Sequence, residues 1–157
     1  MFKSEREMQD LFVALLKQRK TCGKIFEEVG NRNFFFRTDV VEYKNRRKII
    51  GYELKLKDFN KLIKQSIYNL SLYDKSYIVI PKDKLENLKK IIAKYPEQEK
   101  INKIGIIVVN EKGYKTVKAP CKKSTRDYKD SWKVGLIQDL IIRGYHKSGE
   151  NQMKSYK

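Results

Sequence analysis

Two acidic residues and a lysine are the side chains in this sequence best suited to chemistry. Residues 47–56 alternate like a half-buried strand: Glu53 and Lys55 share one face, and the other is apolar, with Ile50, Tyr52, Leu54 and Leu56. Asp39 lies in a second strand-like stretch, 33–43, which can pair with the first through a turn at 44–47. Two carboxylates and an ammonium group at one place predict a divalent-metal site beside a general base or charge stabiliser.

The acid-x-lysine triplet alone is weak evidence, because 35% of the residues are charged. Glu42-Tyr43-Lys44 and Asp127-Tyr128-Lys129 have the same pattern. The setting distinguishes Glu53-Leu54-Lys55: an apolar opposite strand face, an acid upstream, and a helix and an apolar strand directly downstream.

The remaining patterns predict the elements that position these side chains. Residues 4–20 form an amphipathic helix in which Ser4 and Glu7 fit a capping box. A strand at 25–29 precedes the two central strands, and Asp58 is placed to cap a helix reaching residue 70. The segment 77–81 is apolar on both faces, as in a buried parallel strand. A helix at 82–95, strands at 104–109 and 114–118, and a last helix at 124–143 complete the series.

The order helix, three strands, helix, strand, together with Asp39, Glu53 and Lys55, resembles the PD-(D/E)XK phosphodiesterase superfamily, which includes restriction endonucleases and Holliday-junction resolvases. The resemblance covers residues 4–109, and Thr38 stands where the family name places proline. It implies an α/β fold with a restriction-endonuclease-like core, in which helices flank a mixed central sheet.

The resemblance also implies roles for individual residues. Asp39, Glu53 and the carbonyl of Leu54 would hold Mg²⁺, with Mn²⁺ as a substitute, and Lys55 would orient or deprotonate the attacking water. Glu5 falls on the inward side of the first helix, where junction resolvases carry a further metal-binding glutamate; a helix-start acid favoured by the helix dipole is an equal alternative. Gln65 matches a polar position near the scissile phosphate, and equally fits solvent exposure.

The charge of the chain favours a polyanionic partner. There are 36 Lys and Arg residues against 19 acids, a net charge of +17. Such a surface binds nucleic acid by releasing condensed counterions, and DNA is the leading candidate, although a lysine-rich composition also arises from coding bias or solubility. The cations nearest the predicted site are Arg37, Lys57, Lys61 and Lys64, which could line a phosphate channel and are otherwise ordinary surface residues.

The sequence predicts one cytoplasmic domain with a short tail. Residues 1–118 form the nuclease-like core, 119–144 a connector and a helix packed on the core, and 145–157 a flexible basic tail. Neither a secretory leader nor a membrane-spanning stretch is evident. Cys22 and Cys121 fit no metal-ligand spacing, so we expect reduced thiols.

The predicted function is Mg²⁺-dependent endonucleolytic hydrolysis of nucleic acid, in repair, recombination, restriction or a mobile element. The alternative is an inactive nucleic-acid-binding or partner-binding subunit with the same fold, and a third possibility is a protein-interaction domain. A single site cuts one strand, so double-strand cleavage would require a homodimer or a larger complex.

Overall fold

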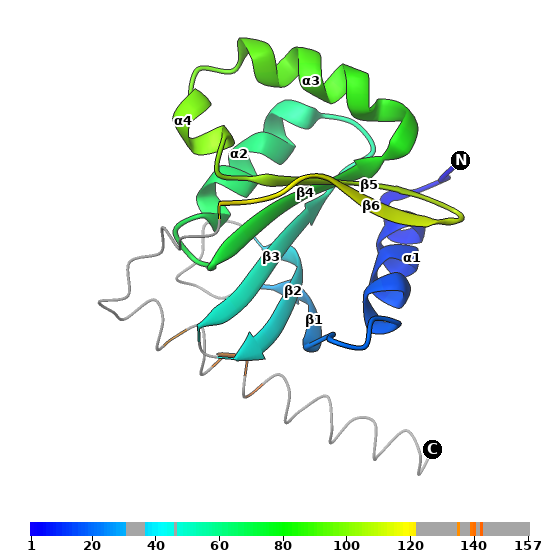
Figure 1. The fold of residues 1–157 in the computed structure, drawn as a ribbon, viewed down its shortest axis with the longest axis vertical. Coiled ribbons are helices and arrows are strands. Elements are labelled where there is room, and N and C mark those ends of the chain that lie inside the picture. The colour runs from blue at the N-terminus through cyan, green and yellow to red at the C-terminus, as the bar shows by residue number, and fades with distance from the viewer. Residues whose placement is uncertain (31–36, 46, 122–134, 136–138, 141, 143–157) are drawn as a thin grey trace. The chain divides into compact units, whose positions relative to one another are not determined.

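A six-stranded mixed β-sheet forms the centre of the fold (Figure 1). The computed structural model describes residues 1–30, 37–45, 47–121, 135, 139–140 and 142. The chain divides into two compact units, Met1–Arg126 and Asp127–Lys157. Apart from four positions, the predicted last helix and the predicted tail lie outside the described residues, so the account below concerns the first unit.

The strands lie side by side in the order in which they occur in the sequence. They are β1 (Lys24–Val29), β2 (Thr38–Asn45), β3 (Lys48–Leu54), β4 (Lys75–Pro81), β5 (Gly105–Asn110) and β6 (Gly113–Lys118). The first three form an antiparallel meander, β3, β4 and β5 are mutually parallel, and β6 returns antiparallel beside β5. The carboxyl ends of β3, β4 and β5 therefore meet at one edge of the sheet.

Helices cover both faces of this sheet. The helix α1 (Glu5–Lys17) lies on one face, and α2 (Phe59–Asn69), α3 (Leu85–Lys94) and α4 (Gln98–Ile101) lie on the other (Figure 1). Ser4 caps α1 as predicted, since its Oγ accepts a hydrogen bond from the Glu7 N–H at 3.1 Å. The predicted α/β class, with a mixed sheet flanked by helices, is confirmed.

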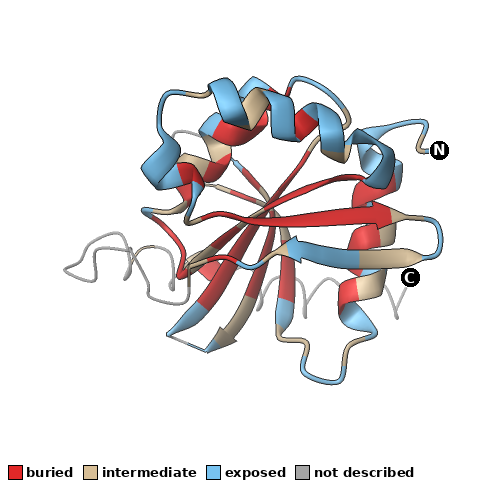
Figure 2. Ribbon diagram, turned by 45° about the horizontal axis from the view of Figure 1, so that its top comes forward, coloured by how far each residue is buried: buried red, intermediate tan, exposed pale blue. Residues whose placement is uncertain are grey.

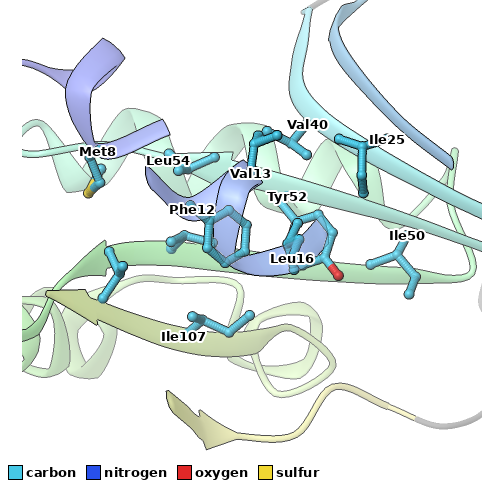
Figure 3. Packing of buried hydrophobic residues seen from close by; sticks show 12 residues of the cluster. Met8, Phe12, Val13, Leu16, Ile25, Val40, Ile50, Tyr52, Leu54 and Ile107 are labelled. Carbon is cyan, nitrogen blue, oxygen red and sulfur yellow. The ribbon is translucent and has the colours of Figure 1, made fainter. Parts of the chain in front are cut away.

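Each face of the sheet has its own apolar core. Figure 2 shows buried residues along the central strands and the inner sides of the helices, and Figure 3 shows the α1 side, where Phe12 meets Tyr52 edge-on with ring centroids 5.2 Å apart. That core includes Met8, Phe12, Leu16, Val40, Ile50, Tyr52, Leu54 and Val79. The opposite core contains Leu62, Ile63, Ile78, Ile80 and Leu88. Because helices cover both faces of β3 and β4, the sequences of these two strands are apolar at most positions.

Two local predictions need correction, and one short helix was not predicted. Asp58 precedes α2 but makes no side-chain capping bond, because its backbone is left-handed, with φ of 60°. The predicted helix at 82–95 opens with a 3₁₀ turn, η1 (Lys82–Lys84), so α3 starts at Leu85. The short helix α4 was not predicted, since four residues are too few to show a helical period.

Within the described part of the chain, no helix is long and apolar enough to cross a membrane. Cys22 and Cys121 are half-buried and are not joined in a disulfide.

Candidate active site

Asp39 and Glu53 lie together on the sheet. Asp39 is the second residue of β2, and Val40 pairs with Tyr52, so Asp39 and Glu53 occupy neighbouring positions on antiparallel strands. Their side chains are in hydrogen-bonding contact with each other. Asp39 Oδ2 also accepts a hydrogen bond from the Leu54 N–H at 2.9 Å. Glu53 is only 1% exposed, whereas Asp39 is half-buried, so Asp39 is the more accessible member of the pair.

Burial and mutual repulsion make this pair resist double ionisation. Burial raises the pKa of Glu53 well above its usual range, and the negative charge of Asp39 raises it further. Burial also raises the pKa of Asp39, against the lowering effect of the hydrogen bond from Leu54. Among the described residues, neither carboxylate forms an ion pair with a lysine or arginine. The pair therefore needs either a shared proton or a bound cation.

A polar relay from α2 fixes the orientation of Glu53. Asn69 Nδ2 donates to Glu53 Oε1 at 3.1 Å, and Thr38 Oγ donates to Asn69 Oδ1 at 3.4 Å. The Thr38 hydroxyl also lies 2.7 Å from the Tyr73 hydroxyl. Asn69 and Thr38 are buried, so these contacts hold the glutamate rotamer in place. Sequence reasoning missed Asn69. The signal that could have identified it is an amide side chain on the inward, apolar side of α2.

Lys55 and Glu5 meet at the end of β3. The strand ends at Leu54, and the N–H of Lys55 still donates a hydrogen bond to the Val79 carbonyl of β4 at 3.3 Å. Lys55 Nζ lies 3.9 Å from Glu5 Oε1, and Glu5 Oε2 accepts a hydrogen bond from the Leu56 N–H at 3.2 Å. The ammonium charge still acts on Asp39, because it lowers the pKa of that carboxyl against the larger raising effect of burial.

The oxygen ligands offered to a metal are thus two carboxylates rather than three. Within the described ranges, no three His, Cys, Asp or Glu side chains gather closely enough to hold one ion. Glu5 reaches the site but contacts Lys55 and the backbone of Leu56, not the pair. Two adjacent carboxylates without a cationic partner fit Mg²⁺, which takes one or two carboxylates and keeps several waters. The carbonyl of Leu54 remains the predicted third protein ligand.

The other predicted site residues lie further from the pair. Gln65 is half-buried on α2, and its side chain makes no hydrogen bond within the described part of the structure; Asn69, one turn later, is the α2 residue that reaches Glu53. The predicted phosphate-binding cations are exposed: Arg37 just before β2, Lys57 after β3, and Lys61 and Lys64 on α2.

A cluster of one amide and two acidic side chains lies beside the Asp39–Glu53 pair on the α1 side. Sequence reasoning did not find it. Gln9 Nε2 donates to Glu27 at 3.0 Å, and it lies 3.4 Å from both Glu28 Oε1 and the Asp39 carbonyl. Glu28 has a left-handed backbone, with φ of 53°, and is skipped in the pairing of β1 with β2. Arg6 lies 3.3 Å from Glu27 and 3.4 Å from Glu28, so one guanidinium offsets part of the charge of these two acids, and the charge of Glu28 still raises the pKa of Asp39.

Glu42, the acid of the competing triplet, has the opposite environment. It is fully buried and accepts hydrogen bonds from Arg19 at 2.7 Å, the Gly23 N–H at 3.0 Å and the Tyr52 hydroxyl at 2.8 Å. Burial alone would raise the pKa of Glu42, but the bonds from Gly23, Arg19 and Tyr52 lower it below its usual range. Glu42 is a structural carboxylate with three hydrogen-bond donors and a cationic partner, whereas Glu53 accepts a hydrogen bond from Asn69 and has no cationic partner among the described residues.

These pKa directions predict how Glu53→Gln changes stability with pH. The folded protein holds the Glu53 proton to higher pH than the unfolded chain, whose glutamates titrate near ~4.3. Its contribution to the free energy of unfolding is therefore present below that pH and is lost as pH rises through the folded pKa. We expect Glu53→Gln to gain stability relative to wild type as pH rises from 5 to 8. Urea unfolding at both pH values in EDTA measures this, and a constant difference between the two proteins would contradict it.

Comparison with known proteins supports the fold without extending to function. No protein-family model matches the chain, and no curated protein sequence matches it. Among solved structures, the chain is similar to a protein of unknown function from Silicibacter pomeroyi, with a TM-score of 0.67 and 15% identity, over 97% of this chain and 94% of that one. At that identity, the similarity shows that the two proteins share the α/β fold.

Proposed function

We propose that this chain is a Mg²⁺-dependent endonuclease that hydrolyses phosphodiester bonds in nucleic acid, with DNA as its substrate. The observation that carries the proposal is the pair formed by the buried Glu53 and the half-buried Asp39, which has no cationic partner among the described residues. Burying two adjacent carboxylates destabilises a protein unless something neutralises them, and a divalent ion does so while activating water and phosphate.

Each residue then has a definite task. Asp39 and Glu53 bind the ion, and Asn69 keeps the Glu53 carboxylate turned toward Asp39. The ion supplies charge for the phosphoryl oxygens and makes a bound water easier to ionise. Lys55, held 3.9 Å from Glu5, is positioned at the open end of β3 to orient the attacking water by donating a hydrogen bond to it, or to neutralise the phosphate.

The surface supports a polyanionic substrate. The net charge is +17, and Arg37, Lys57, Lys61 and Lys64 are exposed on segments that flank the pair. Phosphate contacts of this kind position a nucleic acid without reading its sequence. We place this activity in the cytoplasm, on DNA.

The Lys55→Ala protein tests the proposal. We expect Mg²⁺-dependent nicking of supercoiled DNA to fall by about 10²- to 10⁴-fold, because this is the usual contribution of a group that transfers a proton or stabilises charge. Lys48→Ala, which removes an exposed lysine at the opposite end of the same strand, is the matched control and should cut like wild type. Full cutting by purified Lys55→Ala and Asp39→Asn proteins would refute the assignment.

A non-catalytic nucleic-acid-binding subunit with the same fold is the second candidate. It is favoured by the lack of a third metal-binding carboxylate within the described residues and by the contact of Glu5 with Lys55. Calorimetry with Mn²⁺ separates the two: an active site binds the ion and loses it in Glu53→Ala protein, whereas a degenerate site gives no heat in either.

A further inference from the structure

A pocket lined by lysines lies at the tip of the β5–β6 hairpin. Its volume is about 200 Å³, and Lys82, Lys112 and Lys115 line it together with Asn110, Gly113 and Tyr114. The lysines come from three elements: Lys82 begins η1, Lys112 belongs to the hairpin turn, and Lys115 lies on β6. None of the described residues that line the pocket is acidic.

The pocket lies on the same edge of the sheet as the carboxylate pair. β3, β4 and β5 are parallel and end at Leu54, Pro81 and Asn110, so Lys82 and the hairpin turn extend from the edge at which Lys55 leaves β3. Neighbouring strands are about 4.8 Å apart, which puts the pocket roughly 10 to 14 Å from β3, two to three strands away.

The three lysines form no ion pair within the described residues, although Asp83 follows Lys82 and Glu111 precedes Lys112 in the sequence. Other lysines do: Lys89 lies 3.5 Å from Glu86, and Lys100 lies 3.1 Å from Glu97. None of Lys82, Lys112 and Lys115 forms such an ion pair in the part of the chain that the structure describes. Like charges around one hollow repel one another, and a bound anion would relieve that repulsion.

The hairpin that carries the pocket is fixed in place. The Tyr114 ring meets Phe12 of α1 edge-on at a centroid distance of 5.6 Å, and this contact ties β6 to the core. Asn110 Oδ1 accepts a hydrogen bond from the Lys112 N–H at 2.9 Å, which orders the turn. The lysines therefore project from a preformed frame, and binding there requires little ordering of the backbone.

The size of the pocket restricts its ligand. Cofactor and drug-sized sites typically measure about 300 to 1,000 Å³, so a pocket of about 200 Å³ suits a smaller group such as a phosphate. We infer that this pocket binds a backbone phosphate of the nucleic-acid strand whose scissile bond lies at Asp39 and Glu53. The identity of the ligand rests on the function proposed above. A duplex carries one phosphate per 3.4 Å of helix axis on each strand, so for a duplex axis that runs along this edge the bound phosphate is roughly three to four nucleotides from the cut.

Binding in EDTA tests the inference without requiring cleavage. The probe is a fluorescent duplex of roughly 20 base pairs, long enough to span both positions. The pocket variant is Lys82→Gln, Lys112→Gln and Lys115→Gln together. The control carries Lys20→Gln, Lys24→Gln and Lys48→Gln, which removes the same charge from exposed residues at the opposite edge of the sheet. Thermal melts establish that both triple variants are folded.

The pocket variant should bind about tenfold more weakly than the control, and its log–log salt slope should be smaller by about 1, the loss of one phosphate contact. Equal affinity and slope for the two triple variants would overturn the inference. Inorganic phosphate binding is followed by NMR titration. If the pocket variant loses phosphate binding but binds DNA as tightly as the control, the inference is also overturned, because the pocket would then hold free phosphate.

The test separates this inference from the proposed function. Pocket-dependent binding in EDTA with no cutting in Mg²⁺ supports the pocket and refutes the nuclease. Cutting in Mg²⁺ by the pocket variant at the control's rate, with the control's affinity, supports the nuclease and refutes the pocket.

Discussion

Asp39→Asn protein is expected to lose Mg²⁺-dependent DNA cleavage and to become more stable in metal-free buffer at the same time. An asparagine oxygen can still accept the 2.9 Å hydrogen bond from the Leu54 N–H, and its amide can donate to Glu53. The repulsion within the buried pair disappears. We expect the free energy of unfolding at pH 8 to rise by about 1 kcal/mol or more, and cutting to fall by at least ~10³-fold.

Chemical unfolding in EDTA and a nicking assay in Mg²⁺ measure the two effects on the same preparations. Glu53→Gln should behave in the same way, because Asn69 can still donate to the remaining carbonyl oxygen. Glu99→Gln, at an exposed acid of α4, is the control for loss of one negative charge. A drop in stability for both Asp39→Asn and Glu53→Gln would mean that the pair is a structural contact and not a metal site.

The second large effect concerns stability alone. Glu42→Ala should lower the free energy of unfolding by about 3–5 kcal/mol, because it leaves a half-buried Arg19 and the hydroxyl of Tyr52 without their shared acceptor. Glu42→Gln keeps the shape and some of the hydrogen bonds and should lose less. Urea unfolding at pH 7 gives both values.

Cleavage per folded molecule should be unchanged in Glu42→Gln protein, because Glu42 lies toward the opposite end of β2 from Asp39 and points into the α1 side of the sheet with Tyr52. Loss of cutting in a protein that remains folded would transfer the catalytic role to the competing triplet.

The sequence predicted the strands well because their apolar content is strong and their spacing is regular. β3, β4, β5 and β6 lie within two residues of the predicted segments, and the buried run at 77–81 pairs in parallel as expected. Two features of α2 were not predicted: the backbone conformation of Asp58 and the burial of Asn69. Asp58 begins the helix with a left-handed backbone, and Asn69 turns inward, because tertiary contacts decide which polar side chains of a helix are buried.

Only part of the candidate site could be predicted from the sequence. Asp39 and Glu53 meet because strand pairing fixes their neighbours, and that register follows from the alternation of apolar residues. The contact of Lys55 with Glu5 could not be predicted, since it depends on β3 ending at Leu54 and on where α1 begins. The difference between Glu42 and Glu53 depends on Arg19 and Gly23, which are distant in sequence from both acids.

The central claim is that Asp39 and Glu53 share one divalent ion. A crystal structure of the wild-type chain soaked with Mn²⁺ tests it most directly, because the anomalous signal locates the ion. We expect one Mn²⁺ bonded to a carboxylate oxygen of each residue and to the Leu54 carbonyl, and no ion in Glu53→Gln crystals. Crystals in which the two carboxylates remain in contact without manganese, or in which the ion binds elsewhere, would contradict the account.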